Sequence, residues 1–172
     1  MYRLALLLIL FFSSPAWSAD KYSCMQQAEH RQFDFWVGSW QVSNEEGDKT
    51  YGNNTITIEE DGCLLTEHWQ SASGNSGSSI NYFNPADGQW HQLWVDSGSS
   101  IIDITGGVVD GSMVLTGDIY YLLEKKQASF RGRWTPLPDG SVRQFFEEQD
   151  DQGAWKPWFD GHYRPLEATK LP

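Results

Sequence analysis

The chain has 172 residues, 12 basic and 23 acidic side chains, a formal net charge of −11, and an aromatic content of 15% that includes 9 tryptophans. A surface of this charge repels polyanions, so nucleic acids and anionic membranes are not expected as partners. The length that remains after an export signal is about 150 residues, which suits one domain with its own core.

The first segment has the pattern of a secretory signal peptide. It carries one positive charge at Arg3, an apolar stretch from Leu4 to Phe12, and small residues just before its end. The apolar stretch is too short to cross a bilayer. We expect a signal peptide at residues 1–19 and a single domain at residues 20–172, which is periplasmic or secreted and not inserted in a membrane.

Two cysteines, Cys24 and Cys63, lie downstream of the predicted signal. An exported chain meets an oxidising compartment, where a pair of cysteines favours a disulfide. Such a bond would tie the N-terminal segment to a strand. The alternative is two buried thiols.

The densest group of large apolar residues lies at residues 33–42 and contains Phe33, Trp36 and Trp40. Gly38 interrupts the group, and polar and apolar residues alternate after it, as in a half-buried strand. We predict a short helical or irregular plug before Gly38, with Trp40 as the first inward residue of the first strand.

The rest of the chain alternates between turn residues and short runs of β-branched and aromatic residues, which is typical of an antiparallel meander. No long stretch repeats with a period of 3.6 residues, so helix is expected only before Gly38. The predicted strands are residues 39–44, 54–60, 63–71, 78–84, 89–96, 99–105, 112–121, 128–135, 141–148 and 155–163.

Ten hairpin-linked strands favour an all-β fold, an antiparallel up-and-down β-barrel of lipocalin-like kind. Closure is expected because an open sheet would leave two hydrogen-bonding edges bare. A barrel of this size has room for an internal cavity open at one end. A Greek-key sandwich is the alternative, because sequence spacing alone does not distinguish the two.

Alternation along the predicted strands brings indole, amide and carboxyl groups to one face of the sheet. Aromatic walls with a few converging polar groups suit an amphipathic or ring-bearing ligand. The residues expected to line such a pocket are Glu67, Trp69, Asn81, Trp90, Gln92, Trp94, Trp134 and Gln144. The expected function is therefore binding of a small apolar or amphipathic molecule inside the barrel.

Two other functions remain open. A filled barrel, with the polar groups turned outward, would be a structural protein. A carbohydrate-active hydrolase could use Glu67 and Asp96 as its carboxylate pair, but spacing across strands does not fix the separation that this chemistry needs. The chain contains no motif for a serine hydrolase, a zinc protease, a phosphate loop or a calcium loop. We therefore assign no catalytic residue and no metal ligand.

Several short motifs together resemble an uncharacterised family of exported bacterial β-barrel proteins with the pattern FDFWxGxW. The resemblance covers nearly all of the expected mature chain, and it implies a fold rather than an activity. The matching stretches are Phe33-Asp34-Phe35-Trp36-Val37-Gly38-Ser39-Trp40, Gly62-Cys63, Ser79-Ile80-Asn81-Tyr82-Phe83-Asn84, Trp90-His91-Gln92-Leu93-Trp94-Val95-Asp96, Gly140-Ser141-Val142-Arg143-Gln144 and Phe159-Asp160-Gly161-His162-Tyr163-Arg164.

Gly38-Ser39-Trp40 is also similar to the Gly-x-Trp signature of lipocalin-like barrels, which bind small apolar ligands. In those folds an arginine of the last strand lies across the signature tryptophan. The resemblance assigns that structural role to Arg164, packed over Trp40, with Arg143 as the alternative.

Haem barrels of the nitrobindin type are similar in strand count and in their Gly-x-Trp start. That resemblance implies haem as a possible cofactor, with an axial histidine on the last strand. His162 is the residue at the corresponding place. Without this resemblance, no cofactor is expected.

Overall fold

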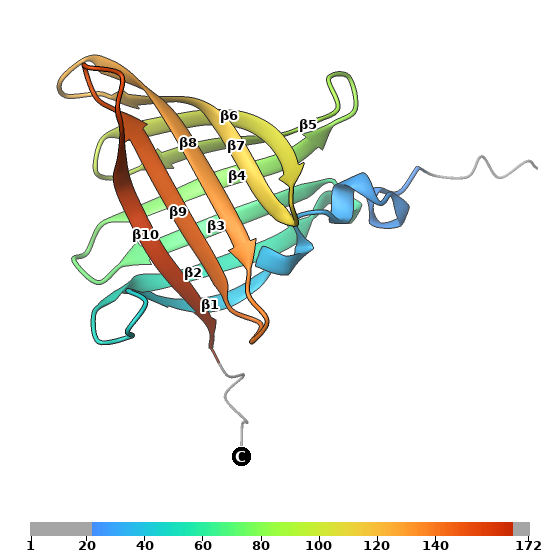
Figure 1. Ribbon diagram of the computed structural model, residues 1–172. Helices are drawn as coiled ribbons and strands as arrows, with labels where there is room; N and C mark the ends of the chain where they lie inside the picture. Colours follow the sequence, from blue (N-terminus) through green and yellow to red (C-terminus); the bar gives the residue numbers. More distant parts are fainter. Residues whose placement is uncertain (1–21, 167–172) are drawn as a thin grey trace, which may run out of the picture.

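The computed structural model describes residues 22–166, and ten antiparallel strands form most of this part (Figure 1). The predicted strands are all present, with ends that differ by a few residues. Their bounds are β1 Gly38–Ser43, β2 Thr50–Glu59, β3 Leu64–Ser71, β4 Ser76–Asn84, β5 Gln89–Asp96, β6 Ser100–Val109, β7 Ser112–Tyr121, β8 Lys126–Pro136, β9 Val142–Gln149 and β10 Trp155–Pro165.

The sheet closes on itself. Each strand pairs with the next along the chain, and β1 also pairs with β10, so the order of neighbours forms a complete ring. The closing seam joins Trp40 to Pro165 at one end and Ser43 to His162 at the other. The predicted up-and-down barrel is confirmed, and the Greek-key sandwich is excluded.

Tight turns set the register of the hairpins. Between β6 and β7, Asp110 and Gly111 adopt left-handed φ values of 50° and 76°. Two such residues in succession form the hairpin turn whose twist matches that of the flanking strands. The turn pairs Val109 with Ser112, so Met113 and Leu115 face the core on alternate positions.

The N-terminal segment closes one end of the barrel, as predicted for the plug. It forms three 3-10 turns, η1 Cys24–Gln26, η2 Glu29–Arg31 and η3 Asp34–Trp36. The rings of Phe33 and Trp36 are fully buried and stack with centroids 4.9 Å apart, and Trp134 meets Phe33 edge-on at 5.3 Å. Aromatic burial therefore anchors a segment that has little regular structure of its own.

A fourth 3-10 turn, η4 Glu60–Gly62, links β2 to β3. The prediction that helix occurs only before Gly38 is wrong at this point. Asp61 has a left-handed φ of 54° within the turn, so the chain reverses there without a hairpin of regular type.

The predicted disulfide between Cys24 and Cys63 is confirmed, with a sequence separation of 39 between the two cysteines. It joins η1 to the residue after η4. Arg31 adds a second link to the same turn, because its guanidinium donates a hydrogen bond to the Gly62 carbonyl. The plug is thus held to the wall of the barrel by a covalent bond and a charged hydrogen bond.

The two ends of the barrel differ. The closed end carries the plug, η4 and the β4–β5, β6–β7 and β8–β9 turns, because β1 begins directly after the plug and strand directions alternate. The open end carries the β1–β2, β3–β4, β5–β6, β7–β8 and β9–β10 turns. Figure 1 shows the plug, in blue, beside one end of the barrel and away from the β1–β2 turn.

No helix within residues 22–166 has the length and apolar character needed to cross a membrane. The predicted signal peptide at residues 1–19 lies outside the described residues.

Arg164 does not lie across Trp40, in contrast to the role that the lipocalin resemblance implies. It pairs with Gln41, one position along the strand, so alternation directs its side chain to the opposite face of the sheet from Trp40. Its guanidinium donates hydrogen bonds to Ser43 Oγ and to two carbonyls of the β1–β2 turn. The Trp40 indole instead donates to the Trp36 carbonyl at 2.9 Å, which ties the first strand to the plug.

Candidate functional site: a cavity in the open half of the barrel

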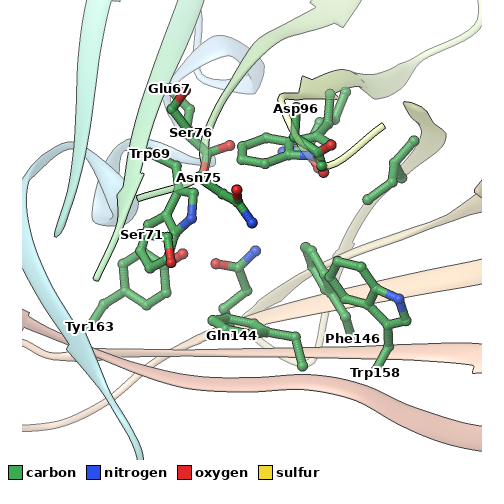
Figure 2. Close-up of a pocket in the computed structure, with 15 residues that line it drawn as sticks. Glu67, Trp69, Ser71, Asn75, Ser76, Asp96, Gln144, Phe146, Trp158 and Tyr163 are labelled. Carbon is green, nitrogen blue, oxygen red and sulfur yellow. Dashed lines mark hydrogen bonds between the residues drawn. The ribbon is translucent and has the colours of Figure 1, made fainter. Parts of the chain in front are cut away.

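The open half of the barrel contains a cavity of about 200 Å³ (Figure 2). Its wall mixes aromatic and polar side chains from β3, β4, β5, β6, β9 and β10. The lining residues are Glu67, Trp69, Ser71, Asn75, Ser76, Gln92, Trp94, Asp96, Gly98, Ile102, Gln144, Phe146, Trp158, Phe159 and Tyr163. Figure 2 shows the amide groups of Asn75 and Gln144 directed into the space between the aromatic rings.

Two indoles of the wall lie over glycines of neighbouring strands. A Cβ atom at Gly77 would lie 2.2 Å from the Trp94 ring, and a Cβ at Gly52 would lie 2.7 Å from the Trp69 ring. These separations are below van der Waals contact, so any other residue would displace the indole and, at Gly52, also the Gln70 carbonyl oxygen at 2.3 Å. The glycines therefore set how close each indole lies to the sheet.

The opposite wall is built in the same way. A Cβ at Gly132 would lie 2.5 Å from the Phe146 ring, and Figure 2 shows Phe146 beside Trp158. The Trp158 indole donates a hydrogen bond to Tyr121 Oη at 2.9 Å, and Tyr121 donates in turn to a Glu148 oxygen at 2.5 Å. Trp158 keeps 41% of its surface exposed, so it lies at the rim of the cavity.

The polar base of the cavity is centred on Glu67, which is 3% exposed. Asn54 Nδ2 donates to Glu67 Oε1 at 2.6 Å, and Ser79 Oγ donates to Glu67 Oε2 at 2.6 Å. Each carboxylate oxygen has a second lone pair, so Glu67 retains acceptor capacity after these two bonds.

The network continues into the neighbouring strands. Asn54 also donates to Tyr163 Oη at 3.2 Å. On the other side, Asn81 donates to Ser79 Oγ at 2.9 Å, and Gln92 donates to Asn81 Oδ1 at 2.7 Å. The network spans β2, β3, β4, β5 and β10, and it holds the carboxyl group of Glu67 in one place.

Burial raises the pKa of Glu67 to about 7, and the hydrogen bonds from Ser79 and Asn54 partly oppose this shift. Burial, followed by the nearby charge of Glu67, raises the pKa of Tyr163 well above its usual value. Glu67 therefore changes charge near neutral pH, whereas the Tyr163 phenol stays neutral there.

Among the described residues in and directly behind the cavity wall, two buried acceptors have no hydrogen-bond partner, namely Gln144 Oε1 and Asn54 Oδ1. Gln144 is 5% exposed and lines the cavity. A buried polar atom without a partner costs free energy, so each of these atoms is a place for a donor supplied by water or ligand. The cavity thus combines an aromatic wall with at least one free hydrogen-bond acceptor, Gln144 Oε1.

Asp96 lines the same cavity, but its carboxylate is engaged in hydrogen bonds that have a structural role. Its carboxylate accepts hydrogen bonds from the Ser100 backbone N–H at 2.9 Å, from Ser100 Oγ at 2.5 Å and from the Trp94 indole at 3.2 Å. These bonds shape the β5–β6 turn and fix Trp94. Glu67 and Asp96 therefore share the cavity, as the hydrolase alternative requires, but Asp96 is engaged by its own turn.

Five of the eight residues predicted to bind a ligand line the cavity: Glu67, Trp69, Gln92, Trp94 and Gln144. Asn81 does not line the cavity but belongs to the hydrogen-bond network that surrounds Glu67.

Trp90 and Trp134 do not line the cavity. Trp90 donates to the Glu29 carbonyl at 3.2 Å, and Trp134 packs on Phe33, so both belong to the plug contacts. The reason is their position along the strand. Trp90 precedes Trp94 by four residues, or about 13 Å of extended chain, toward the closed end.

Sequence reasoning missed part of the wall. Phe146 shares a strand face with Gln144, and Tyr163 lies inward on the last strand, so alternation could have identified both. Trp158 and Phe159 are consecutive and both reach the cavity, because the register of β10 shifts between Pro157 and Phe159. No pattern in the sequence locates such a bulge.

His162 does not line the cavity. Its neighbour Tyr163 points inward, so alternation turns His162 to the outer face of β10, where it pairs with Arg143 and Ser43 across the sheet. The cavity lining contains no histidine, so the axial role that the haem resemblance implies has no residue there. In the described part of the chain, no group of three or more His, Cys, Asp or Glu side chains is arranged to hold a metal ion.

The fold and the cavity define a closed ten-stranded barrel with an internal pocket, an architecture compatible with a ligand-binding protein. The chain matches no known protein-family model, and a comparison with curated proteins finds no match.

Proposed function

We propose that the protein binds a small apolar or amphipathic molecule in the cavity of the barrel. The observation that carries this proposal is the combination, in one cavity, of aromatic walls with Gln144 Oε1, a buried acceptor that has no partner. Apolar surface supplies affinity, and the few polar atoms orient the ligand. A core that only filled the barrel would leave neither the space nor the unpaired acceptor in the lining.

The cavity volume indicates the size of the ligand. About 200 Å³ exceeds the volume of roughly 150 Å³ that accommodates benzene in an engineered cavity. One ring with a short substituent therefore fits. A second hollow of about 460 Å³ shares Trp69, Ser71, Trp158 and Phe159 with the cavity and provides space for a longer substituent toward solvent.

The proposal includes export to the periplasm or the medium. The disulfide supports it, because such bonds persist in oxidising compartments. Membership of the exported bacterial family with the FDFWxGxW pattern belongs to the same proposal.

The test is a titration of the purified protein with single-ring compounds, followed by tryptophan fluorescence. Trp69, Trp94 and Trp158 line the cavity, so a bound ring should change the emission in a saturable manner. Ser71→Trp should abolish binding, because Ser71 is on the inward face of β3 and lines both hollows.

The matched control is Ser129→Trp, which adds the same side chain at an exposed position of β8. Binding should persist in this control. The absence of saturable binding in the wild-type protein, or its persistence in a folded Ser71→Trp variant, would contradict the proposal.

A further inference from the structure

The charge of the cavity lining points to one class of ligand. Two carboxyl side chains, Glu67 and Asp96, belong to the lining, whereas none of the described residues that line it is a lysine, arginine or histidine. The whole chain carries a formal net charge of −11. A carboxylate or phosphate ligand would enter this cavity without a cationic partner and against like charge.

The cavity lining offers hydrogen-bond acceptors that are free to bond. Gln144 Oε1 is buried without a partner, and Glu67 has lone pairs left after its bonds to Asn54 and Ser79. A ligand that satisfies them must donate hydrogen bonds. An amino group donates up to three, and a hydroxyl group donates one.

The aromatic walls favour the same choice. An ammonium ion is attracted to the face of an indole, and the cavity offers the rings of Trp69 and Trp94 within one lining. Figure 2 shows Glu67 and Trp69 on the same side of the cavity, so one group can meet the carboxylate and an indole together.

We propose that the cavity selects ring compounds with an amino group over those with a carboxylate, and that Glu67 receives the amine. This inference rests on the proposed binding function, because it names the ligand class of the same cavity. No covalent step is involved, and the ammonium ion and the carboxylate form a hydrogen-bonded ion pair.

Binding of the amine should depend on pH. The other titratable groups in the lining are Asp96 on β5 and Tyr163 on β10. In the network, β2 and β4 present the neutral Asn54, Ser79 and Asn81, and β9 presents the neutral Gln144 to the cavity. Burial places the pKa of Glu67 at about 7. An ammonium ion binds the ionised carboxylate, so its affinity should rise by about tenfold between pH 6 and pH 8.

The experiment compares three probes that share a phenyl ring and a short chain: 2-phenylethylamine, 2-phenylethanol and 3-phenylpropionate. Tryptophan fluorescence and calorimetry measure their affinities at pH 6 and pH 8. At pH 8 the amine should bind at least about tenfold more tightly than the carboxylate, with the alcohol between them. The affinity of the alcohol should not change between the two pH values.

Glu67→Gln should lower the affinity of the amine to that of the alcohol and remove its pH dependence. Asp118→Asn is the matched control, because it removes one carboxylate from an exposed position of β7 and should change nothing. If Glu67→Gln does not fold, the pH series on the wild-type protein tests the same point.

Equal or tighter binding of the carboxylate at pH 8, or an amine preference that survives Glu67→Gln, would overturn the inference. Toluene is the neutral reference. Saturable binding of toluene without any preference for the amine would overturn the amine selection but leave the binding function standing. The absence of saturable binding by every probe would overturn both.

Discussion

Glu67 is a buried acid that lowers the stability of the fold at neutral pH. Its pKa rises from 4.5 in the unfolded chain to about 7 in the barrel, because burial disfavours the charged form. Between these two values the unfolded chain loses the proton and the folded protein keeps it. The contribution of Glu67 to stability is therefore most favourable below pH 4.5 and becomes less favourable as the pH rises toward 7.

Glu67→Gln should relieve this cost. The variant keeps the shape and an acceptor, so at pH 8 it should be more stable than the wild-type protein by up to about 3 kcal/mol. At pH 4 the difference should be close to zero. Urea unfolding at the two pH values measures it, and an equal gain at both would show that the carboxyl charge is not responsible.

The indole walls depend on particular glycines. In Gly77→Ala the new methyl group would overlap the Trp94 ring, which lies 2.2 Å from the ideal Cβ position. We expect a loss of about 1 to 3 kcal/mol in unfolding free energy and a changed Trp94 emission. Thermal unfolding and fluorescence measure the two effects.

Gly107→Ala provides the comparison, because a Cβ at Gly107 meets no atom within 4 Å. It should be neutral or slightly stabilising, since alanine restricts the unfolded chain more than glycine does. Equal effects of the two substitutions would contradict the packing explanation.

Alternation in the sequence correctly placed Glu67, Gln92 and Gln144 on the inner face of their strands. Alternation could not tell how far each residue lies from the closed end of the barrel. Trp90 and Trp94 share a face, yet one packs on the plug and the other lines the cavity. The position of a residue along the barrel axis depends on which end of the barrel the plug closes, and that is set by tertiary contacts.

At the scale of elements, the plug depends on aromatic contacts and on one covalent bond. The number of strands was predictable, because turn residues and β-branched runs are local signals. The η4 turn was not, since its left-handed Asp61 lies next to the disulfide and the plug. Contacts with residues distant in sequence, in the disulfide and the plug, therefore stabilise that conformation.

Removal of the disulfide should destabilise the protein by about 4 kcal/mol in the chain-entropy model, given the 39-residue separation of Cys24 and Cys63. The double variant Cys24→Ala/Cys63→Ala should unfold at a lower urea concentration than the wild-type protein. Reductant should lower the midpoint of the wild-type protein and leave that of the variant unchanged. A midpoint of the oxidised wild-type protein equal to that of the variant would contradict this role.

At the scale of the whole molecule, closure was predictable because open sheet edges are unfavourable. The length of the closing seam was not. The seam pairs only residues 40–43 of β1 with residues 162–165 of β10, whereas β6 and β7 are paired from Ser100 to Val109. The seam is short because β1 ends at Ser43, where the β1–β2 turn begins.

The short seam should open before the rest of the barrel. Native-state hydrogen exchange should show that amides of β1 and of the last residues of β10 exchange at a lower free energy than those of β6 and β7. The latter should require global unfolding. Equal protection of both groups would show that the seam is as stable as the longer pairings.

The described chain begins at the plug and ends where Pro165 pairs with Trp40, so both of its ends lie on the same side of the barrel. The hairpin turns around the mouth lie on the other side. A surface linker joined directly at Tyr22 or Leu166 would therefore start on the side away from the mouth. Immobilised protein would present the cavity to the flowing sample, a geometry suited to surface-based titration with the proposed ligands.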